Sequence, residues 1–379
     1  MSSKTGYYTS TMEPVLAFLQ QLVEIESPSD DPAALRRCAQ FLADQFSPLA
    51  SVRLLGVRRH APHLRAEFRL PGVRKKGQIL LLGHYDTVYP IGTLARMPFR
   101  LSGDRAFGPG VFDMKGGIAI ALFALRALRE QDRPIRRRVV LLLNSDEEVG
   151  SASSRAFTEA EARRSDAVLV LEPSAGLEGS VKTGRKGVGS YVIKVRGRAA
   201  HAGLDFTAGA SATLELSRQL LQVASFTDLR RGITVNPGII SGGTRVNVVA
   251  EHASAEIDIR VGRLGDAVRL DRKFRRLRPH DPRTSLSIEG GLNRPPLERS
   301  AAVARLYRLA CRLAAELGVS LGEAQVGGGS DGNFTAALGV PTLDGLGAVG
   351  EGAHSPEESV LLHRLPDRIA LLARLLESV

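Results

Sequence analysis

The sequence lacks several features that mark secreted and membrane proteins. Cysteine is nearly absent: Cys38 and Cys311 are the two among 379 residues, and neither has the spacing of a zinc or redox motif. A disulfide between them is conceivable, but two buried thiols are the favoured interpretation. No run approaches the roughly 18 uninterrupted apolar residues of a membrane span. Residues 1–7 lack the apolar stretch of a secretory signal, so we expect a disordered leader and a cytoplasmic protein without membrane contact.

Acidic residues are outnumbered by basic ones, with 40 Asp and Glu against 51 Lys and Arg and a formal net charge of +11. The densest basic run, residues 269–278, lacks the interleaved aromatic side chains on which single-stranded nucleic acid stacks. We interpret this run as a solvated helix face and expect no nucleic-acid partner. A positive field also attracts acidic substrates, and a polyanion-binding protein without catalysis remains a remote alternative.

The order of apolar runs predicts an α/β fold. The chain is long for a single core, which favours two domains. Short continuous apolar runs at residues 78–82, 138–144 and 167–171 are typical of parallel strands that helices cover on both faces. They alternate with helical periodicity, for example at residues 32–46 and 115–130. We therefore predict a mixed, largely parallel sheet with helices on both faces.

The middle of the chain has a different pattern. Residues 253–261 alternate apolar and polar side chains, which is typical of an antiparallel strand with one covered face. Further strand-like and helical segments surround this run and predict a smaller α+β, ferredoxin-like domain. We place this domain at residues 183–296, inserted into a larger domain formed by residues 1–182 and 297–379.

Side chains that can bind metals follow the predicted strands. His84, Glu148 and Glu172 each lie just beyond one of the apolar runs. Because ligands bind at the carboxyl edge of the strands in an open α/β sheet, we expect these side chains at one edge. Asp113 lies in a glycine-rich turn before the long apolar helix, and His354 lies in a glycine-rich loop. These five residues are the candidate metal ligands.

The composition of this set predicts its chemistry. Two histidines and three carboxylates without cysteine favour zinc or another borderline divalent ion. Five ligands are too many for one open tetrahedral zinc, but they suffice for two ions if one carboxylate is shared. Two-metal hydrolytic sites hold their ions roughly 3.5–4 Å apart, a span that a carboxylate bridges. The spare member of the Glu147–Glu148 pair is then free to act as a general base, and Asp86 can hold the second ring nitrogen of His84.

Six short motifs carry a resemblance to a known family. The sequence is similar to the dizinc peptidase family of glutamate carboxypeptidase, acetylornithine deacetylase, succinyl-diaminopimelate desuccinylase and aminoacylase, and is most similar to the folate-cleaving glutamate carboxypeptidase branch. The resemblance runs from about residue 13 to the C-terminus. Its motifs are GHYDTV at 83–88, GVFDMKGG at 110–117, DEEVGS at 146–151, LEP at 171–173, AHAG at 200–203 and GGSD at 328–331.

The resemblance implies a role for each candidate ligand. His84 and Glu172 would complete one zinc site, Glu148 and His354 would complete the other, and Asp113 would bridge the two ions. Cobalt or manganese are possible substitutes for zinc. The peptide bond after Asp113 is expected to be cis.

Further roles follow from the same resemblance. Asp86 would orient His84, and Glu147 would deprotonate the water between the ions. His201 would lie on the inserted domain and reach the active site of the partner subunit, where it would stabilise the oxyanion. We therefore expect a homodimer formed through residues 183–296.

The resemblance also implies substrate contacts. Asn247 and Arg260 match positions that hold a substrate carboxylate, and a guanidinium grips a carboxylate with two hydrogen bonds. Gly328 and Gly329 would let the backbone approach the substrate closely. Ser180 stands where the folate-cleaving enzyme carries a lysine, so the preference for glutamate stays open.

We therefore hypothesise a dizinc metallohydrolase. It would cleave the amide bond of peptides or N-acyl amino acids that carry a free α-carboxylate, as a glutamate carboxypeptidase does. An N-acyl amino acid deacylase of the acetylornithine deacetylase or desuccinylase type is the alternative within the same class.

Overall fold

The computed structural model describes residues 8, 10–58, 60–72 and 76–379, and the chain divides into two compact units. Unit 1 comprises Met1–Gly184, Arg299–Val326 and Ser330–Val379, and unit 2 comprises Arg185–Glu298 and Gly327–Gly329. The sequence predicts these divisions after residues 182 and 296. The leader expected at residues 1–7 lies outside the described residues.

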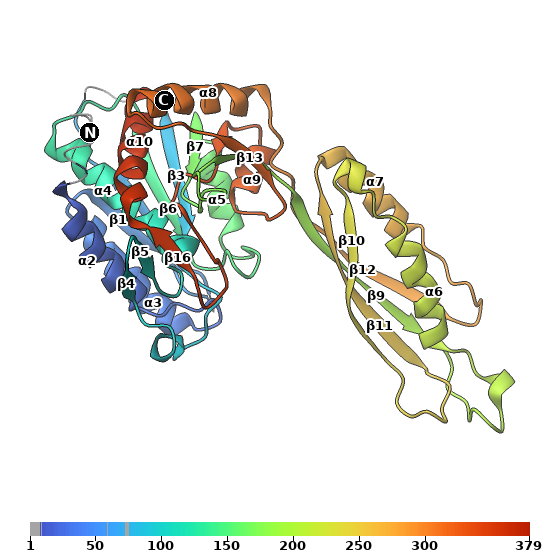
Figure 1. Ribbon diagram of the computed structural model, residues 1–379. Coiled ribbons are helices and arrows are strands. Elements are labelled where there is room, and N and C mark those ends of the chain that lie inside the picture. Colours follow the sequence, from blue (N-terminus) through green and yellow to red (C-terminus); the bar gives the residue numbers. More distant parts are fainter. Residues whose placement is uncertain (1–7, 9, 59, 73–75) are drawn as a thin grey trace. The chain divides into compact units, whose positions relative to one another are not determined.

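A six-stranded mixed sheet forms the centre of unit 1 (Figure 1). Its strands, in spatial order, are β1 Ala50–Leu55, β2 His63–Phe68, β6 Arg138–Asn144, β3 Gln78–His84, β7 Ala167–Val170 and β14 Thr342–Leu343. The last four are parallel, whereas β1 and β2 run antiparallel to their neighbours. The predicted mixed, largely parallel sheet is confirmed.

Helices cover both faces of this sheet, which explains why its central strands are apolar throughout. Alternate residues of a strand point to opposite faces. Leu81 belongs to the larger core, which is built with α2 Met12–Val23, α3 Pro32–Phe46, α4 Gly116–Glu130, α8 Ala301–Glu316 and α10 Leu365–Ser378. Leu80 and Leu82 belong to a smaller core on the other face, packed with α5 Arg155–Ala162 and with Leu338, which follows α9 Gly332–Ala337.

Short strands complete unit 1. The four-stranded sheet β15-β16-β5-β4 consists of β15 Gly350–Glu351, β16 Ser359–Leu361, β5 Arg105–Phe107 and β4 Arg100–Ser102. A two-stranded sheet joins β8 Val181–Arg185 to β13 Glu323–Val326. The β15–β16 hairpin matters for the site because it carries His354.

Unit 2 is a four-stranded antiparallel sheet with the order β10-β11-β9-β12. The chain order is β9 Gly187–Arg196, α6 Ala212–Ala224, β10 Thr234–Gly242, β11 His252–Val261, α7 Leu264–Arg275 and β12 Ser285–Arg294. This βαββαβ order is ferredoxin-like, as expected. The basic run 269–278 lies along α7 and just beyond it, where Leu270 and Phe274 are buried and Arg272 and Arg276 are exposed.

Both cysteines are free. Cys38 is buried, whereas Cys311 is only half-buried, which differs from the expected pair of buried thiols. Within the described part of the chain, no helix combines the length and the apolar character needed to cross a bilayer.

Candidate metal centre

Three parallel strands bring candidate ligands to one edge of the sheet of unit 1. His84 ends β3 and is in register with Asn144, the last residue of β6. The turn after β6 carries Glu148, and Glu172 follows β7 by two residues. Since parallel strands end on the same side, the residues that follow them gather at a common edge.

The five candidate ligands form two groups that overlap in one residue. His84 Nε2 lies 3.2 Å from Asp113 Oδ1 and 3.3 Å from Glu172 Oε1. His354 Nε2 lies 3.2 Å from Glu148 Oε1 and 3.6 Å from Asp113 Oδ2. Asp113 therefore presents one carboxylate oxygen to each group.

The spacing of these donors fits zinc. Ligands about 2.0–2.1 Å from a tetrahedral zinc lie about 3.3 Å from one another, and the separations above fall close to that value. Imidazole and carboxylate donors suit the same ion. Each group supplies three protein ligands, which is the number that leaves a catalytic zinc one open position.

The turn that carries Asp113 is irregular. It spans Val111–Lys115 and leads directly into α4. The peptide bond from Asp113 to Met114 is cis, as the resemblance implies.

Asp86 contacts both the histidine and the glutamate pair. The ring nitrogen Nδ1 of His84 makes a 3.0 Å hydrogen bond with the backbone carbonyl of Asp86, and the Asp86 carboxylate lies 3.3 Å from the same nitrogen. That carboxylate accepts hydrogen bonds from the backbone N–H groups of Glu147 and Glu148, at 3.2 and 3.1 Å, and from the Ser29 hydroxyl at 2.7 Å. Asp86 thus also orients the turn of the glutamate pair, which the sequence did not indicate.

The electrostatics of the cluster favour a bound positive charge. Burial alone would lower the pKa of His84, but the nearby Asp113, Asp86 and Glu172 carboxylates raise it well above its usual range. The hydrogen bond that His354 donates to the Glu148 carboxylate raises the pKa of His354 to about 9. Burial raises the pKa of Glu148 despite its contact with His354. A divalent ion would replace the protons that these carboxylates hold on the two rings.

Two candidate site residues of unit 2, the proposed oxyanion donor His201 and the proposed substrate contact Asn247, lie on neighbouring backbone segments. The backbone N–H of Ala202 donates to the Asn247 carbonyl at 3.0 Å, and the backbones of His201 and Val248 form an isolated antiparallel β-bridge. His201 Nδ1 accepts from the N–H groups of Gly203 and Leu204 at 3.1 and 3.2 Å. The ring proton must then sit on Nε2, so the exposed His201 ring is a hydrogen-bond donor at its outer nitrogen.

Arg260 is held by its own strand. Its Nε donates to both carboxylate oxygens of Asp258, at 2.9 and 3.1 Å, which leaves the outer guanidinium nitrogens for other contacts. Arg260 pairs in register with Val188, and Val188 pairs with Arg294 on the other side. Directly opposite residues share a face of the sheet, so Arg294 lies two strands from Arg260 on the same face. The sequence reasoning missed Arg294, which is the last residue of β12 and directly precedes Pro295.

Gly328 and Gly329 lie beside buried arginines. Arg185 Nη1 donates to both glycine carbonyls, at 3.2 and 3.1 Å. A Cβ added at Gly329 would approach Val188 to 2.9 Å and Arg294 to 3.2 Å. Arg185 and Arg294 are 5% and 8% exposed, so this glycine segment packs closely on a buried basic surface of unit 2.

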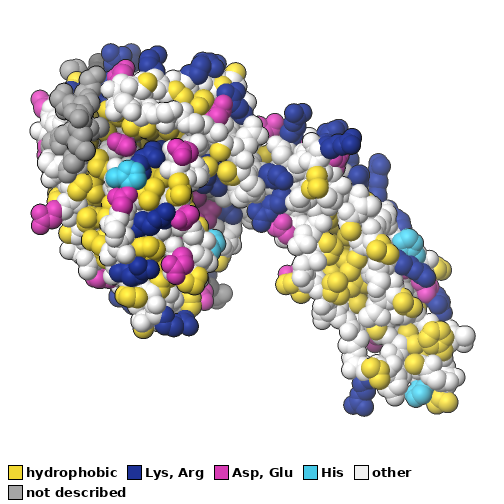
Figure 2. Space-filling view, viewed as in Figure 1, with side chains coloured by type: hydrophobic (Ala, Val, Ile, Leu, Met, Phe, Trp, Pro, Cys, Tyr) yellow, Lys and Arg dark blue, Asp and Glu magenta, His cyan; other side chains and the backbone are white. Residues whose placement is uncertain are grey.

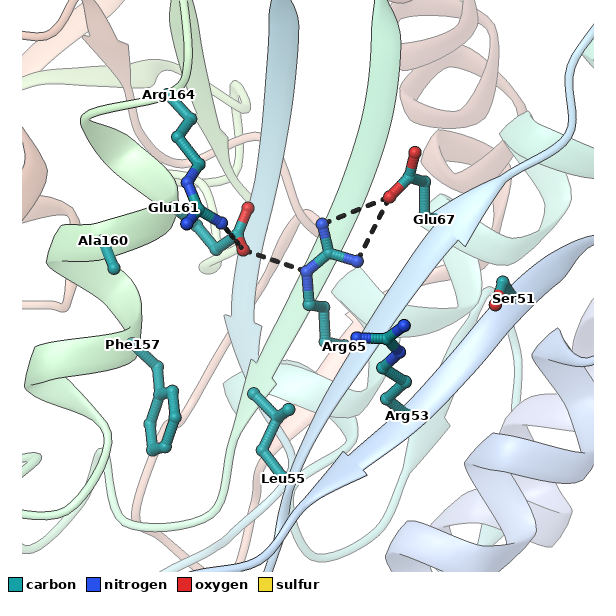
Figure 3. Close-up of a pocket in the computed structure, with 9 residues that line it drawn as sticks. All are labelled: Ser51, Arg53, Leu55, Arg65, Glu67, Phe157, Ala160, Glu161 and Arg164. Atoms are coloured by element: carbon teal, nitrogen blue, oxygen red, sulfur yellow. Dashed lines mark hydrogen bonds and ion pairs between the residues drawn. The ribbon is translucent and has the colours of Figure 1, made fainter.

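A separate groove of about 380 Å³ lies between β1, β2 and α5 of unit 1 (Figure 3). Arg65 in this groove donates to Glu161 at 2.9 Å and to Glu67 at 3.3 Å. Its guanidinium is therefore neutralised by two carboxylates. The lining holds no histidine and none of the candidate ligands, so the metal cluster and not this groove is the candidate active site.

A sheet edge that gathers two histidines and three carboxylates, with one carboxylate shared, defines a metal-dependent hydrolase. The chain belongs to peptidase family M20/M25/M40, whose sequence model matches residues 80–378. It is 30% identical to carboxypeptidase G2 of Pseudomonas sp. (strain RS-16) over 375 residues, which cover 97% of this chain and 90% of that protein. It is also 30% identical to acetylornithine deacetylase of Salmonella arizonae over 218 residues, or 50% of this chain and 55% of that one.

Solved structures share the fold. Aminopeptidase PepT from Bacillus cereus has a TM-score of 0.78 at 20% identity, covering 97% of this chain and 98% of its own. The M20 family metallo-carboxypeptidase Sso-CP2 from Sulfolobus solfataricus has a TM-score of 0.71 at 18% identity, covering 96% and 98%. The family membership and the similarity to carboxypeptidase G2 make the protein an enzyme of the metallopeptidase class.

Proposed function

We propose that the protein is a dizinc carboxypeptidase-type amidohydrolase. It would cleave the amide bond of small peptides or N-acyl amino acids that carry a free α-carboxylate. The observation that carries this proposal is the division of Asp113 between two donor groups, with Oδ1 at 3.2 Å from His84 and Oδ2 at 3.6 Å from His354. A carboxylate so placed suits a bridging role between two ions.

Each donor group would hold one ion. His84 and Glu172 would hold the first, Glu148 and His354 the second, and Asp113 both. When bound, the ions supply Lewis acidity for the scissile carbonyl and lower the pKa of an attacking water.

The residues of the chain would carry the proton and the developing charge. Glu147 is oriented by the hydrogen bond from its N–H to Asp86 at 3.2 Å. In this proposal its carboxylate takes the proton of the attacking water and later delivers it to the leaving amine. The Nε2–H donor of His201 would stabilise the oxyanion, in the active site of the partner subunit.

The free carboxylate of the substrate would bind to unit 2. Arg260 and Asn247 are the proposed contacts, with Gly328 and Gly329 lining the approach. We add Arg294 to this set because it shares a sheet face with Arg260 and has a buried guanidinium. Two cations on one face favour an acidic substrate.

A homodimer through unit 2 is part of the proposal. Its exposed surface carries large apolar side chains, many of them visible in Figure 2, which is unusual for a face that stays in water. Among them, Leu221 is 78% exposed on α6, and Ile239 and Ile240 are 59% and 61% exposed on β10. Burying such residues against a second copy would remove apolar surface from water.

We also propose a cytoplasmic location, as expected from the sequence.

The test is Glu147→Gln, assayed with C-terminal glutamyl amides. Turnover should fall by about 100- to 10,000-fold, the usual contribution of a general base, while two zinc ions per chain remain bound in metal analysis. Glu67 is a carboxylate in the groove of Figure 3, so Glu67→Gln is the matched control and should keep full turnover. Wild-type turnover in Glu147→Gln would contradict the proposed role. The same metal analysis distinguishes zinc from cobalt and manganese.

A second candidate function is an N-acyl amino acid deacylase. The similarity to acetylornithine deacetylase over half of the chain favours it. Both candidates use the same ions and the same base, so only the substrate separates them. A panel of glutamyl amides, N-acetyl amino acids and N-succinyl amino acids decides between them by the ratio of their kcat/KM values.

A further inference from the structure

Glu358 is a buried carboxylate that gathers the backbone of the loop carrying Asp113. Its side chain is completely inaccessible to solvent. Oε1 accepts from the N–H groups of Phe112 and Asp113, both at 2.8 Å, and Oε2 accepts from the N–H of Gly110 at 2.9 Å. One carboxylate therefore satisfies three backbone donors within four consecutive residues, donors that would otherwise be buried without partners.

The same carboxylate is tied to the loop that carries His354. Glu358 lies four residues after His354 and directly before β16, and its N–H donates to the carbonyl of Ser355 at 3.2 Å. The Tyr89 hydroxyl donates to Glu358 Oε2 at 2.5 Å and to the Ser355 carbonyl at 3.1 Å. Glu358 and Tyr89 therefore both hold the loop that carries His354, through the carbonyl of Ser355.

The backbone around Glu358 is held by strand pairing. β16 begins at Ser359, which pairs with Phe107 on β5. The Glu358 carbonyl also accepts from the N–H of Gly108 at 3.4 Å. Main chain and side chain of Glu358 thus both hold the 108–113 segment against the β15–β16 hairpin. The hydrogen bond between Asp113 and Glu358 joins residues that lie 245 positions apart in the sequence.

Glu358 does not contact the donor atoms of either group. The described hydrogen bonds of its carboxylate all go to backbone N–H groups and to Tyr89. Its charge also acts on His354, whose pKa it helps to raise, while its hydrogen bonds set the positions of Asp113 and of the loop that carries His354. Partners outside the ligand shell that orient the ligands commonly contribute strongly to metal affinity.

We propose that Glu358 is a positioning residue that sets the distance between Asp113 and His354 for the second ion. This inference rests on the proposed dizinc function. Two of the three ligands of the second ion depend on Glu358, whereas the first ion depends on it only through Asp113, because His84 and Glu172 are held by β3 and β7. Loss of Glu358 should weaken the second ion more than the first.

The experiment measures the stepwise zinc affinity of the full-length protein by competition with a coloured chelator. Glu358→Gln keeps the shape of the side chain but replaces an acceptor oxygen by an NH₂ group that faces backbone donors. We expect one of the two dissociation constants to rise by about 10- to 100-fold and the other to rise clearly less. Tyr89→Phe removes a single donor to Glu358 and should give a smaller change in the same step.

Glu161→Gln is the matched control. Glu161 is also a buried carboxylate with several hydrogen bonds, to Arg65 and Gln78, but it lies in the groove of Figure 3. Its loss should lower the melting temperature of the metal-free protein and leave both zinc affinities unchanged. That pattern is what a merely structural carboxylate produces.

The outcomes are separable. If the wild type binds two ions and Glu358→Gln binds both as tightly, the positioning role is wrong and the proposed function stands. If the wild type binds fewer than two ions, the dizinc proposal fails first. If Glu358→Gln does not fold, Tyr89→Phe decides, and unchanged affinity for both ions in that variant overturns the inference.

Discussion

Gly117 tests whether the packing of α4 supports the metal centre. It is the second residue of the helix, and a Cβ added there would lie 2.0 Å from the carbonyl oxygen of Leu171 and 3.0 Å from the Met114 Cε atom. The oxygen belongs to the backbone and cannot rotate away. Ordinary contact is more than 1 Å longer, at roughly 3.5 Å, so either α4 or the strand end at Leu171 must move. Glu172, a proposed ligand, is the next residue.

The expected magnitude follows from two opposing effects. Replacing glycine by alanine in a helix stabilises it by about 0.5–1 kcal/mol when space is available. Overpacking a well-filled core costs about 1–3 kcal/mol. We therefore expect Gly117→Ala to lower the free energy of unfolding by about 1–2 kcal/mol and to weaken zinc binding through the displaced Glu172.

Gly265 offers a matched control. It is likewise the second residue of a helix, α7, but its Cβ position has no atom within 4 Å. Gly265→Ala should stabilise unit 2 by about 0.5–1 kcal/mol. Urea unfolding of the metal-free proteins, followed by circular dichroism, measures both changes, with the two units analysed as separate transitions if they unfold separately. A Gly117→Ala variant with wild-type stability and zinc affinity would refute this account of the packing.

Three further outcomes are expected. Burial lowers the pKa of His63 below its usual 6.5, although the Asp146 carboxylate opposes this shift. Below about pH 6.5 the unfolded chain therefore binds more protons than the folded chain, and the free energy of unfolding should fall as the pH drops. His63→Gln should reduce this pH dependence in urea titrations. Arg260→Ala and Arg294→Ala should each lower kcat/KM by about 10- to 100-fold for substrates with a free α-carboxylate, with little effect on C-terminally amidated ones; equal losses on both substrates would exclude a carboxylate contact. Removing the metal with a chelator should lower the melting temperature of unit 1, since an ion at 100 times its dissociation constant contributes about 2.7 kcal/mol, and an unchanged melting curve would argue against a site in the folded core.

The contacts behind the glutamate pair show where sequence reasoning stopped. The i, i+2 spacing of His84 and Asp86 predicted a side-chain contact between them, and the Asp86 carboxylate lies 3.3 Å from His84 Nδ1. The spacing did not predict that the Asp86 carbonyl makes the shorter bond, or that the carboxylate also accepts from the N–H groups of Glu147 and Glu148. Those groups are 61 and 62 residues away in the sequence. Local spacing does not determine which of several acceptors a buried donor finds.

Several structural elements escaped prediction for a related reason. The helix α5 is short and polar on one side, and the four-stranded sheet β15-β16-β5-β4 is made of strands of two or three residues. Such segments carry too little periodicity to stand out, and they are stabilised by long-range partners. The roles of Glu358 and Arg294 escaped prediction for the same reason, because the residues that contact them come from segments distant in the sequence.

The sequence by itself determined the α/β character of unit 1, the ferredoxin-like order of unit 2 and the position of polar residues at strand ends. These properties depend on apolar periodicity and on the common direction of parallel strands, which are local. Only the tertiary structure decided that the two oxygens of Asp113 face different histidines, that Asp86 orients the glutamate pair and that Glu358 joins the loops of Asp113 and His354. These arrangements depend on distances of a few ångströms between groups far apart in the chain, and packing of the whole unit sets those distances.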